Sequence, residues 1–140
     1  MSPRWRSHSV LRVFICVSSL QDMQRRERQL KQMLTHLRID AVSLVMPWDH
    51  VVCHLKSEHP SSTSRVMMES VDMPDQYVSA MNDMIKNNSG SATVCLLNLP
   101  TPPQDVALGE RYLEVLRILT KDLPPTLLVH GISSVISTSL

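Results

Sequence analysis

Residues 92–129 read ATVCLLNLPTPPQDVALGERYLEVLRILTKDLPPTLLV, and the fold is decided in this stretch. Residues 92–99 form a short, nearly continuous apolar run, which predicts a buried strand. Residues 107–121 carry apolar side chains at helical spacing and stop before a pair of prolines, which predicts an amphipathic helix. Residues 126–129 form a second apolar run of strand length. A strand, a helix and a strand in this order predict parallel pairing.

The N-terminal part of the chain shows the same order. Residues 10–17 (VLRVFICV) predict a strand covered on both faces, and residues 21–37 predict an amphipathic helix. Residues 41–47 (AVSLVMP) predict a second strand, reached by a right-handed crossover. A further helix is expected over residues 74–90, opened by a proline. Residues 49–73 are expected to be a long, mobile loop with at most one short helical piece.

This alternation predicts an α/β fold. We expect a single domain over residues 1–140, with a doubly wound, mostly parallel sheet of four to five strands and helices on both faces. The simplest strand order is 2-1-3-4, with an edge strand at residues 134–138 as the fifth. A chain of 140 residues with 43% hydrophobic and 19% charged residues has the size and composition of one globular domain.

Charge and composition exclude several classes of function. The formal net charge is +1 and aromatic residues make up 4%, so nucleic acid is not an expected partner. No apolar run approaches the roughly 20 residues of a membrane-spanning helix, so we expect a soluble chain. The three cysteines, Cys16, Cys53 and Cys95, are odd in number and widely spaced, which predicts buried thiols in a reducing compartment.

No pattern indicates catalysis. A phosphate-binding loop needs glycines, and the three glycines of the chain lie outside the loops that follow the first three strands. One local group of side chains has metal-ligand chemistry, and it comprises Asp49, His50, Cys53, His54 and His59. A structural zinc site usually pairs two such groups, and the chain has no second one, so a polar loop is the preferred interpretation. We expect no catalytic residue, no metal, no cofactor and no enzymatic activity.

Two groups of polar residues are candidate regulatory sites. Four basic residues of the first helix, Arg25, Arg26, Arg28 and Lys31, could bind an acidic partner or lipid headgroups, or could simply be a solvated helix face. Four hydroxyl residues of the long loop, Ser61, Ser62, Thr63 and Ser64, could accept regulatory phosphates, or could be a plain linker.

The last third of the chain resembles the C-terminal end of the cation-chloride cotransporters. The resemblance rests on SATVCLLNLPTPPQD (residues 91–105) and RYLEVLRILTKDLPPTLLVHG (residues 111–131). In that family a buried strand, a proline-containing loop, a YLEVL-type helix and an LLVRG-like strand close the chain. His130 stands where most relatives have arginine, which indicates a divergent member. The similarity is fair over residues 74–90 and weaker over residues 11–48.

The resemblance implies a non-enzymatic, cytosolic regulatory and assembly domain of a chloride-coupled cation symporter. Its implied partners are the transmembrane domain of the same transporter, together with a second copy or a related cotransporter. The implied location is the cytosolic face of the plasma membrane or of an endolysosomal membrane. The membrane part is lacking, so we expect a fragment, an incompletely predicted gene product or a short isoform. A free-standing adaptor that modulates transporters and a small ligand-binding α/β enzyme are the alternatives.

Overall fold

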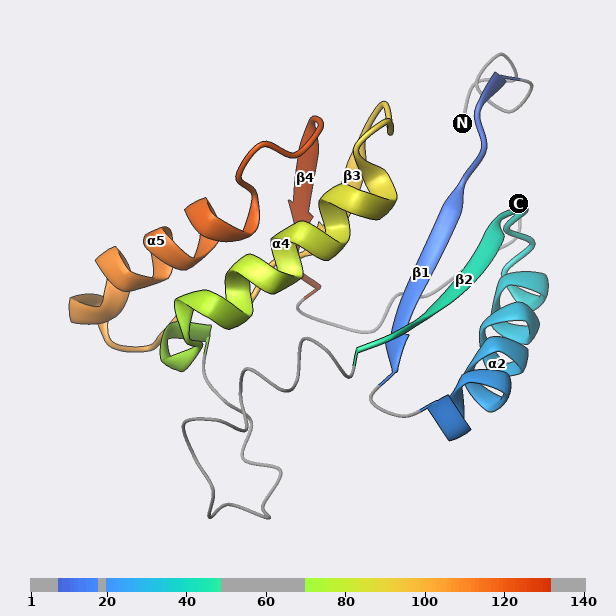
Figure 1. Cartoon of the computed structure of the whole chain (residues 1–140), viewed down its shortest axis with the longest axis horizontal. Helices are drawn as coiled ribbons and strands as arrows, with labels where there is room; N and C mark the ends of the chain where they lie inside the picture. The colour runs from blue at the N-terminus through green and yellow to red at the C-terminus, as the bar shows by residue number, and fades with distance from the viewer. Residues whose placement is uncertain (1–7, 18–19, 49–69, 132–140) are drawn as a thin grey trace. The chain divides into compact units, whose positions relative to one another are not determined.

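The computed structural model describes residues 8–17, 20–48 and 70–131 (Figure 1). These residues fall into two compact units, of which unit 1 extends to Trp48 and unit 2 begins at Ser70. In chain order the elements are β1 (Arg12–Val17), η1 (Leu20–Asp22), α2 (Met23–His36), β2 (Val42–Pro47), η2 (Ser70–Asp72), α4 (Asp75–Ser89), β3 (Cys95–Asn98), η3 (Val106–Leu108), α5 (Gly109–Leu119) and β4 (Thr126–Val129).

Unit 1 consists of a parallel strand pair and its crossover helix. β1 and β2 pair with Arg12 opposite Val42, and α2 packs against them (Figure 1). Leu30 and Leu34 are the buried residues of α2, four positions apart on one face of the helix. The predicted amphipathic helix is therefore confirmed: its buried residues share one face, and its basic residues are exposed.

Unit 2 also contains one parallel strand pair. β3 and β4 pair with Cys95 opposite Thr126. α4 and α5 pack against each other, and Val78, Val115 and Leu119 form the buried cluster between them. Val78 and Val115 are each only 1% exposed, so the core of this unit is centred on the contact of the two helices.

Local sequence signals set the ends of the two helices in unit 2. Pro74 precedes α4 in an extended conformation, and its carbonyl accepts from the backbone N–H of Val78 at 3.1 Å. The predicted opening of this helix by a proline is therefore confirmed. Before α5, the carboxylate of Asp105 accepts from the N–H of Ala107 at 2.9 Å, which caps the short helix η3.

The α/β class is confirmed, and the sheets are smaller than expected. The four described strands form two separate two-stranded sheets, β1–β2 and β3–β4, in place of one sheet in the order 2-1-3-4. Apolar periodicity identifies strands and crossover helices, but it carries no signal for pairing between strands of different β-α-β units. The expected fifth strand, at residues 134–138, lies outside the described residues, and the single-domain organisation stays a prediction.

The predicted burial of the strands on both faces is wrong within the described residues. In unit 1, Val17 is buried whereas Cys16, on the opposite face of β1, is exposed. In unit 2, Cys95 is buried as predicted, whereas Leu127 of β4 is 56% exposed. Side chains of a strand alternate between its two faces, and one face of each pair is left uncovered among the described residues.

The last residues of the predicted loop belong to unit 2. Ser70 and Val71 lie in η2 and are buried, and Ser70 Oγ donates to the carbonyl of Thr101 at 2.8 Å. This short element agrees with the one helical piece that the sequence allowed. These contacts anchor the last residues of the segment to unit 2. Residues 49–69, where mobility was also expected, lie outside the described residues.

Candidate functional site

The four basic residues singled out in the sequence all lie on α2, and we call them the α2 basic cluster: Arg25, Arg26, Arg28 and Lys31. All four are exposed. Arg25 pairs with Asp22 at 2.8 Å and Lys31 pairs with Glu27 at 2.6 Å, both at solvent-exposed positions. Such surface pairs contribute little to stability, so they leave the cluster free to exchange partners.

Two members of the α2 basic cluster have no carboxylate partner within the part of the chain that the structure describes. Arg26 donates to the side-chain amide oxygen of Gln29 at 3.4 Å. Arg28 donates to the backbone carbonyl of Gln24, also at 3.4 Å. These contacts are long and leave most of each guanidinium's donors to solvent. A guanidinium in this state can bind an incoming carboxylate or phosphate without first breaking an ion pair.

A second surface was not foreseen from the sequence. Leu96, Leu127 and Val129 are 61%, 56% and 48% exposed and lie on one face of the β3–β4 pair. We call this the β3–β4 outer face. Leu96 lies directly opposite Leu127 in the register, so two large apolar side chains are adjacent on it. Single exposed leucines are ordinary, but a cross-strand group of apolar side chains is a feature of interaction surfaces.

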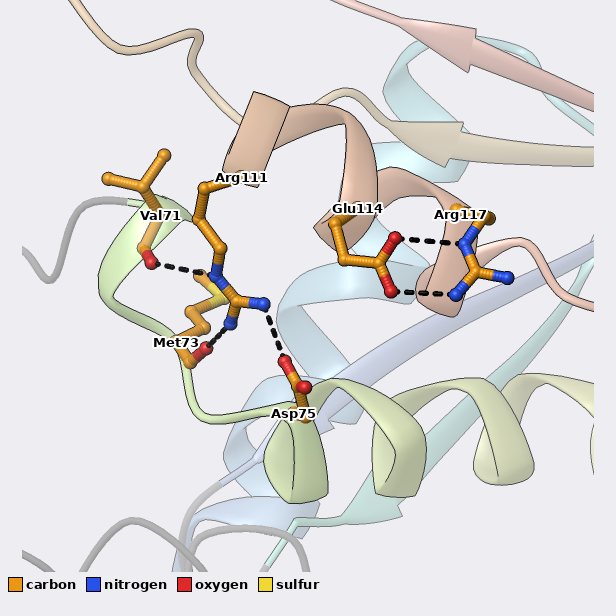
Figure 2. Close-up of polar contacts among 6 residues, drawn as sticks. All are labelled: Val71, Met73, Asp75, Arg111, Glu114 and Arg117. Atoms are coloured by element: carbon orange, nitrogen blue, oxygen red, sulfur yellow. Dashed lines mark hydrogen bonds and ion pairs between the residues drawn. The ribbon is translucent and has the colours of Figure 1, made fainter. Parts of the chain in front are cut away.

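A third arrangement joins α5 to the segment that leads into α4. Arg111 donates to the carbonyl of Met73 and to the carboxylate of Asp75, both at 2.6 Å, and to the carbonyl of Val71 at 3.3 Å (Figure 2). The Arg111 side chain is 34% exposed. Three acceptors on one guanidinium fix its orientation, which indicates a structural clamp and not a ligand site. The sequence contains no signal for this clamp, because two of the acceptors are the backbone carbonyls of Val71 and Met73, which any residue could supply.

One turn further along α5, Arg117 and Glu114 form a bidentate pair, with contacts of 2.9 and 2.7 Å (Figure 2). The hydrogen bonds from Arg117 lower the pKa of the Glu114 carboxyl below its ordinary value. Reciprocally, the hydrogen bonds to Glu114 raise the pKa of Arg117. In contrast to the clamp, both residues belong to the same helix turn, so this pair does not connect distant parts of the chain.

Asn82 is the buried polar residue of α4 and was also missed. It is 5% exposed and donates to the backbone carbonyls of Leu119 and Lys121 at 2.8 and 2.9 Å. The sequence does contain a signal for this role. Asn82 stands on the same face of α4 as Val78 and Ile85, where an apolar residue is expected, and a buried amide needs hydrogen-bond partners.

The other predicted site residues are not placed. The hydroxyl residues Ser61, Ser62, Thr63 and Ser64 and the Asp49–His59 group of metal-type ligands lie outside the described residues. Within residues 8–17, 20–48 and 70–131, no group of three or more His, Cys, Asp or Glu side chains is arranged to hold a metal ion. No helix in these ranges combines the length and the apolar character needed to cross a bilayer.

Comparison with known proteins finds relatives of one kind, members of solute carrier family 12 and cation-chloride cotransporters. A family model described as "Solute carrier family 12" matches residues 68–139. The whole chain is 35% identical to solute carrier family 12 member 9 of Danio rerio and 30% identical to that of Homo sapiens, and it covers 15% and 17% of their lengths. Over 86% of the chain, it is 24% identical to a bumetanide-sensitive sodium-(potassium)-chloride cotransporter of Manduca sexta, of which it covers 13%. The chain therefore spans less than a fifth of each of these relatives.

Proposed function

The chain belongs to solute carrier family 12, and we propose that it is a cytosolic C-terminal regulatory and assembly domain of a cation-chloride cotransporter. The resemblance expected from residues 91–131 is confirmed at the level of the family. In the proposal, chloride-coupled cation symport belongs to the membrane part of the longer protein. This chain acts on that part without catalysis of its own. Its proposed partners are the transmembrane domain, a second copy of the chain or a related cotransporter.

The observation that carries the assembly role is the β3–β4 outer face. Exposed apolar side chains of two adjacent strands lose contact with water when a partner covers them. The binding free energy gained is roughly 25 cal/mol for each Å² of apolar surface buried. Leu96 and Leu127 are more than half exposed, so they have this surface to bury. The β3–β4 outer face also lies in the segment, residues 68–139, that matches the family model. Assembly through this face would place a family-specific segment at the contact.

A chimera tests the assembly role. The segment of the Danio rerio relative that aligns with this chain is replaced by the chain, and dimer content is measured by cross-linking in membranes. Replacing Leu96 and Leu127 by lysine in the chimera should lower the dimer fraction, because two charges then have to be desolvated at the contact. Leu113→Lys is the matched control, since Leu113 is 65% exposed but lies on α5.

The outcomes separate the possibilities. If the dimer fraction falls in the variant with lysine at positions 96 and 127 but not in Leu113→Lys, assembly through the β3–β4 outer face is supported. Unchanged dimer content in all variants would refute that role. A free-standing adaptor is tested separately, by sequencing the transcript upstream of the Met1 codon. A continuous reading frame encoding apolar segments supports a transporter domain, whereas an in-frame stop codon immediately upstream would favour the adaptor.

A further inference from the structure

The charged residues of the described chain are unevenly divided between the two units. The described residues of unit 1, 8–17 and 20–48, include six basic residues and three acidic ones. The basic ones are Arg12, Arg25, Arg26, Arg28, Lys31 and Arg38, and the acidic ones are Asp22, Glu27 and Asp40. Within residues 70–131, unit 2 has four basic residues, Lys86, Arg111, Arg117 and Lys121. Its seven acidic residues are Asp72, Asp75, Asp83, Asp105, Glu110, Glu114 and Asp122. The near-neutral chain therefore combines a basic unit with an acidic one.

Most of the basic charge of unit 1 is on α2, and the helix presents it to solvent. The buried residues of α2, Leu30 and Leu34, hold one side of the helix against β1 and β2. At 3.6 residues per turn, Arg25 and Arg28 then lie on the side away from the sheet. Arg26 lies on the flank that also carries Met33, which is 49% exposed. Basic side chains thus cover the side of α2 that faces away from the sheet and extend onto its flank.

We infer that unit 1 binds the anionic phospholipid surface of a membrane through the α2 basic cluster. Arg25 and Arg28 share the side of α2 that faces away from the sheet, so a planar layer of phosphate and carboxylate groups can contact both at once, with Arg26 at its margin. Arg26 and Arg28, which have no carboxylate partner among the described residues, can reach phosphates without breaking an ion pair. Exposed Met33 adds apolar contact at the headgroup level.

The acidic character of unit 2 is consistent with this contact. An anionic bilayer repels a unit with excess carboxylates and attracts one with excess guanidinium and ammonium groups, so unit 1 is the unit expected to bind it. The choice of a membrane over an acidic protein rests on the proposed function, in which the chain is tethered next to a bilayer. The binding itself is a property of the 140-residue chain and is tested without the rest of a transporter.

Vesicle co-sedimentation of the whole chain tests the inference. We expect binding to vesicles that contain phosphatidylserine, no binding to pure phosphatidylcholine vesicles, and weaker binding as salt is raised. In Arg26→Gln with Arg28→Gln, affinity should fall about 25-fold, since each basic residue near an anionic surface contributes about fivefold. Gln preserves helix propensity, and circular dichroism checks that the variant is folded.

The control removes the same charge from unit 2, with Arg117→Gln and Lys121→Gln, and should leave binding unchanged. Equal binding to both kinds of vesicle, or an equal loss in the control, would overturn the inference. A second result would also overturn it. In that result the chain does not bind vesicles but associates with itself in solution, and this self-association is lost in the Arg26 and Arg28 variant. In that case the anionic partner would be unit 2 of another copy. Failure here leaves the dimer measurement on the chimera unaffected, so the two proposals fail separately.

Discussion

Asn82 of α4 holds the end of α5, because its side-chain amide donates to the backbone carbonyl of Leu119 at 2.8 Å. The same amide donates to the carbonyl of Lys121 at 2.9 Å. The last carbonyls of a helix lack partners within the helix, and here a side chain from the neighbouring helix supplies the donors.

Replacing Asn82 by alanine should destabilise the chain by about 1–3 kcal/mol, since buried carbonyls lose their donors. Urea unfolding measures the change. Asn87→Ala is the matched control, because Asn87 is an exposed residue of the same helix, and it should change the free energy of unfolding by less than about 0.5 kcal/mol. Equal effects in the two variants would show that the buried contacts contribute nothing of their own.

Replacing Arg111 by lysine should destabilise unit 2 even though the charge is kept. An ammonium group cannot satisfy the carbonyls of Val71 and Met73 and the carboxylate of Asp75 in the same planar geometry. We expect about 1–2 kcal/mol, which allows for the partial exposure of the clamp. Arg117→Lys, at a side chain that is 72% exposed, should destabilise the chain much less than Arg111→Lys does. Thermal unfolding of both variants tests the difference, and an equal shift in both would contradict the clamp.

Replacing Arg38 by glycine should stabilise the chain. Arg38 follows α2 with φ of 53°, in the left-handed region that glycine adopts without strain. The backbone N–H of Ile39 donates to the carbonyl of Leu34 at 2.9 Å, the hydrogen bond of a Schellman motif. The gain should be about 0.5–1 kcal/mol, measured by urea unfolding. Thr35→Gly, within the helix, should instead destabilise, and a loss of stability in Arg38→Gly would show that the side chain makes a contact that outweighs the backbone strain.

The thiols of Cys16 and Cys95 should react differently in the folded chain. Cys16 is exposed, but partial burial of its sulfur raises the pKa of the thiol, and the thiolate is the reactive form. In a Cys53→Ser background, iodoacetamide should modify Cys16 slowly at neutral pH and faster as the pH rises. Cys95 is buried and should react only on unfolding. Mass spectrometry of the alkylated peptides measures both rates, and equal rates before unfolding would disprove the burial of Cys95.

The Glu114 carboxyl should titrate below its ordinary pKa in the folded chain. Its hydrogen bonds from Arg117 stabilise the carboxylate, so the contribution to stability is present above the ordinary value of 4.5 and is lost as the pH falls through the lower folded value. Carbon NMR of the carboxyl group measures the pKa. It should rise toward 4.5 in Arg117→Gln and stay unchanged in Lys121→Gln. An unchanged value in the first variant would assign the shift to another cause.

The sequence predicts the described strands and α-helices well, since each has a local signal. The apolar run at β3, the stripe of α5 and the proline before α4 locate these elements to within a few residues. The parallel pairings β1–β2 and β3–β4 follow from the order of strands and crossover helices. The number of strands in each sheet, in contrast, depends on whether the edge strand of one pair forms backbone hydrogen bonds with the edge strand of the other. No pattern of side chains encodes that pairing.

Some of the candidate sites can be predicted from the sequence, and others depend on the tertiary structure. The α2 basic cluster is visible in the sequence because four basic residues occupy one helix. The exposure of Leu127 and Cys16 is not visible, because an apolar strand residue looks the same whether or not another layer covers it. The Arg111 clamp depends on the backbone path through residues 71–75, which is known only once the tertiary structure is formed.

The parallel strand pairs have a consequence for how the chain folds. Arg12 pairs with Val42 and Cys95 with Thr126, so the partners in each sheet are far apart in the chain and cannot meet through a tight hairpin. Closing such long loops loses chain entropy before any strand contact forms. Each sheet can therefore form only after its crossover helix has brought the chain back. We expect α2 and α5 to be structured in the folding transition state, and both sheets to be completed after it.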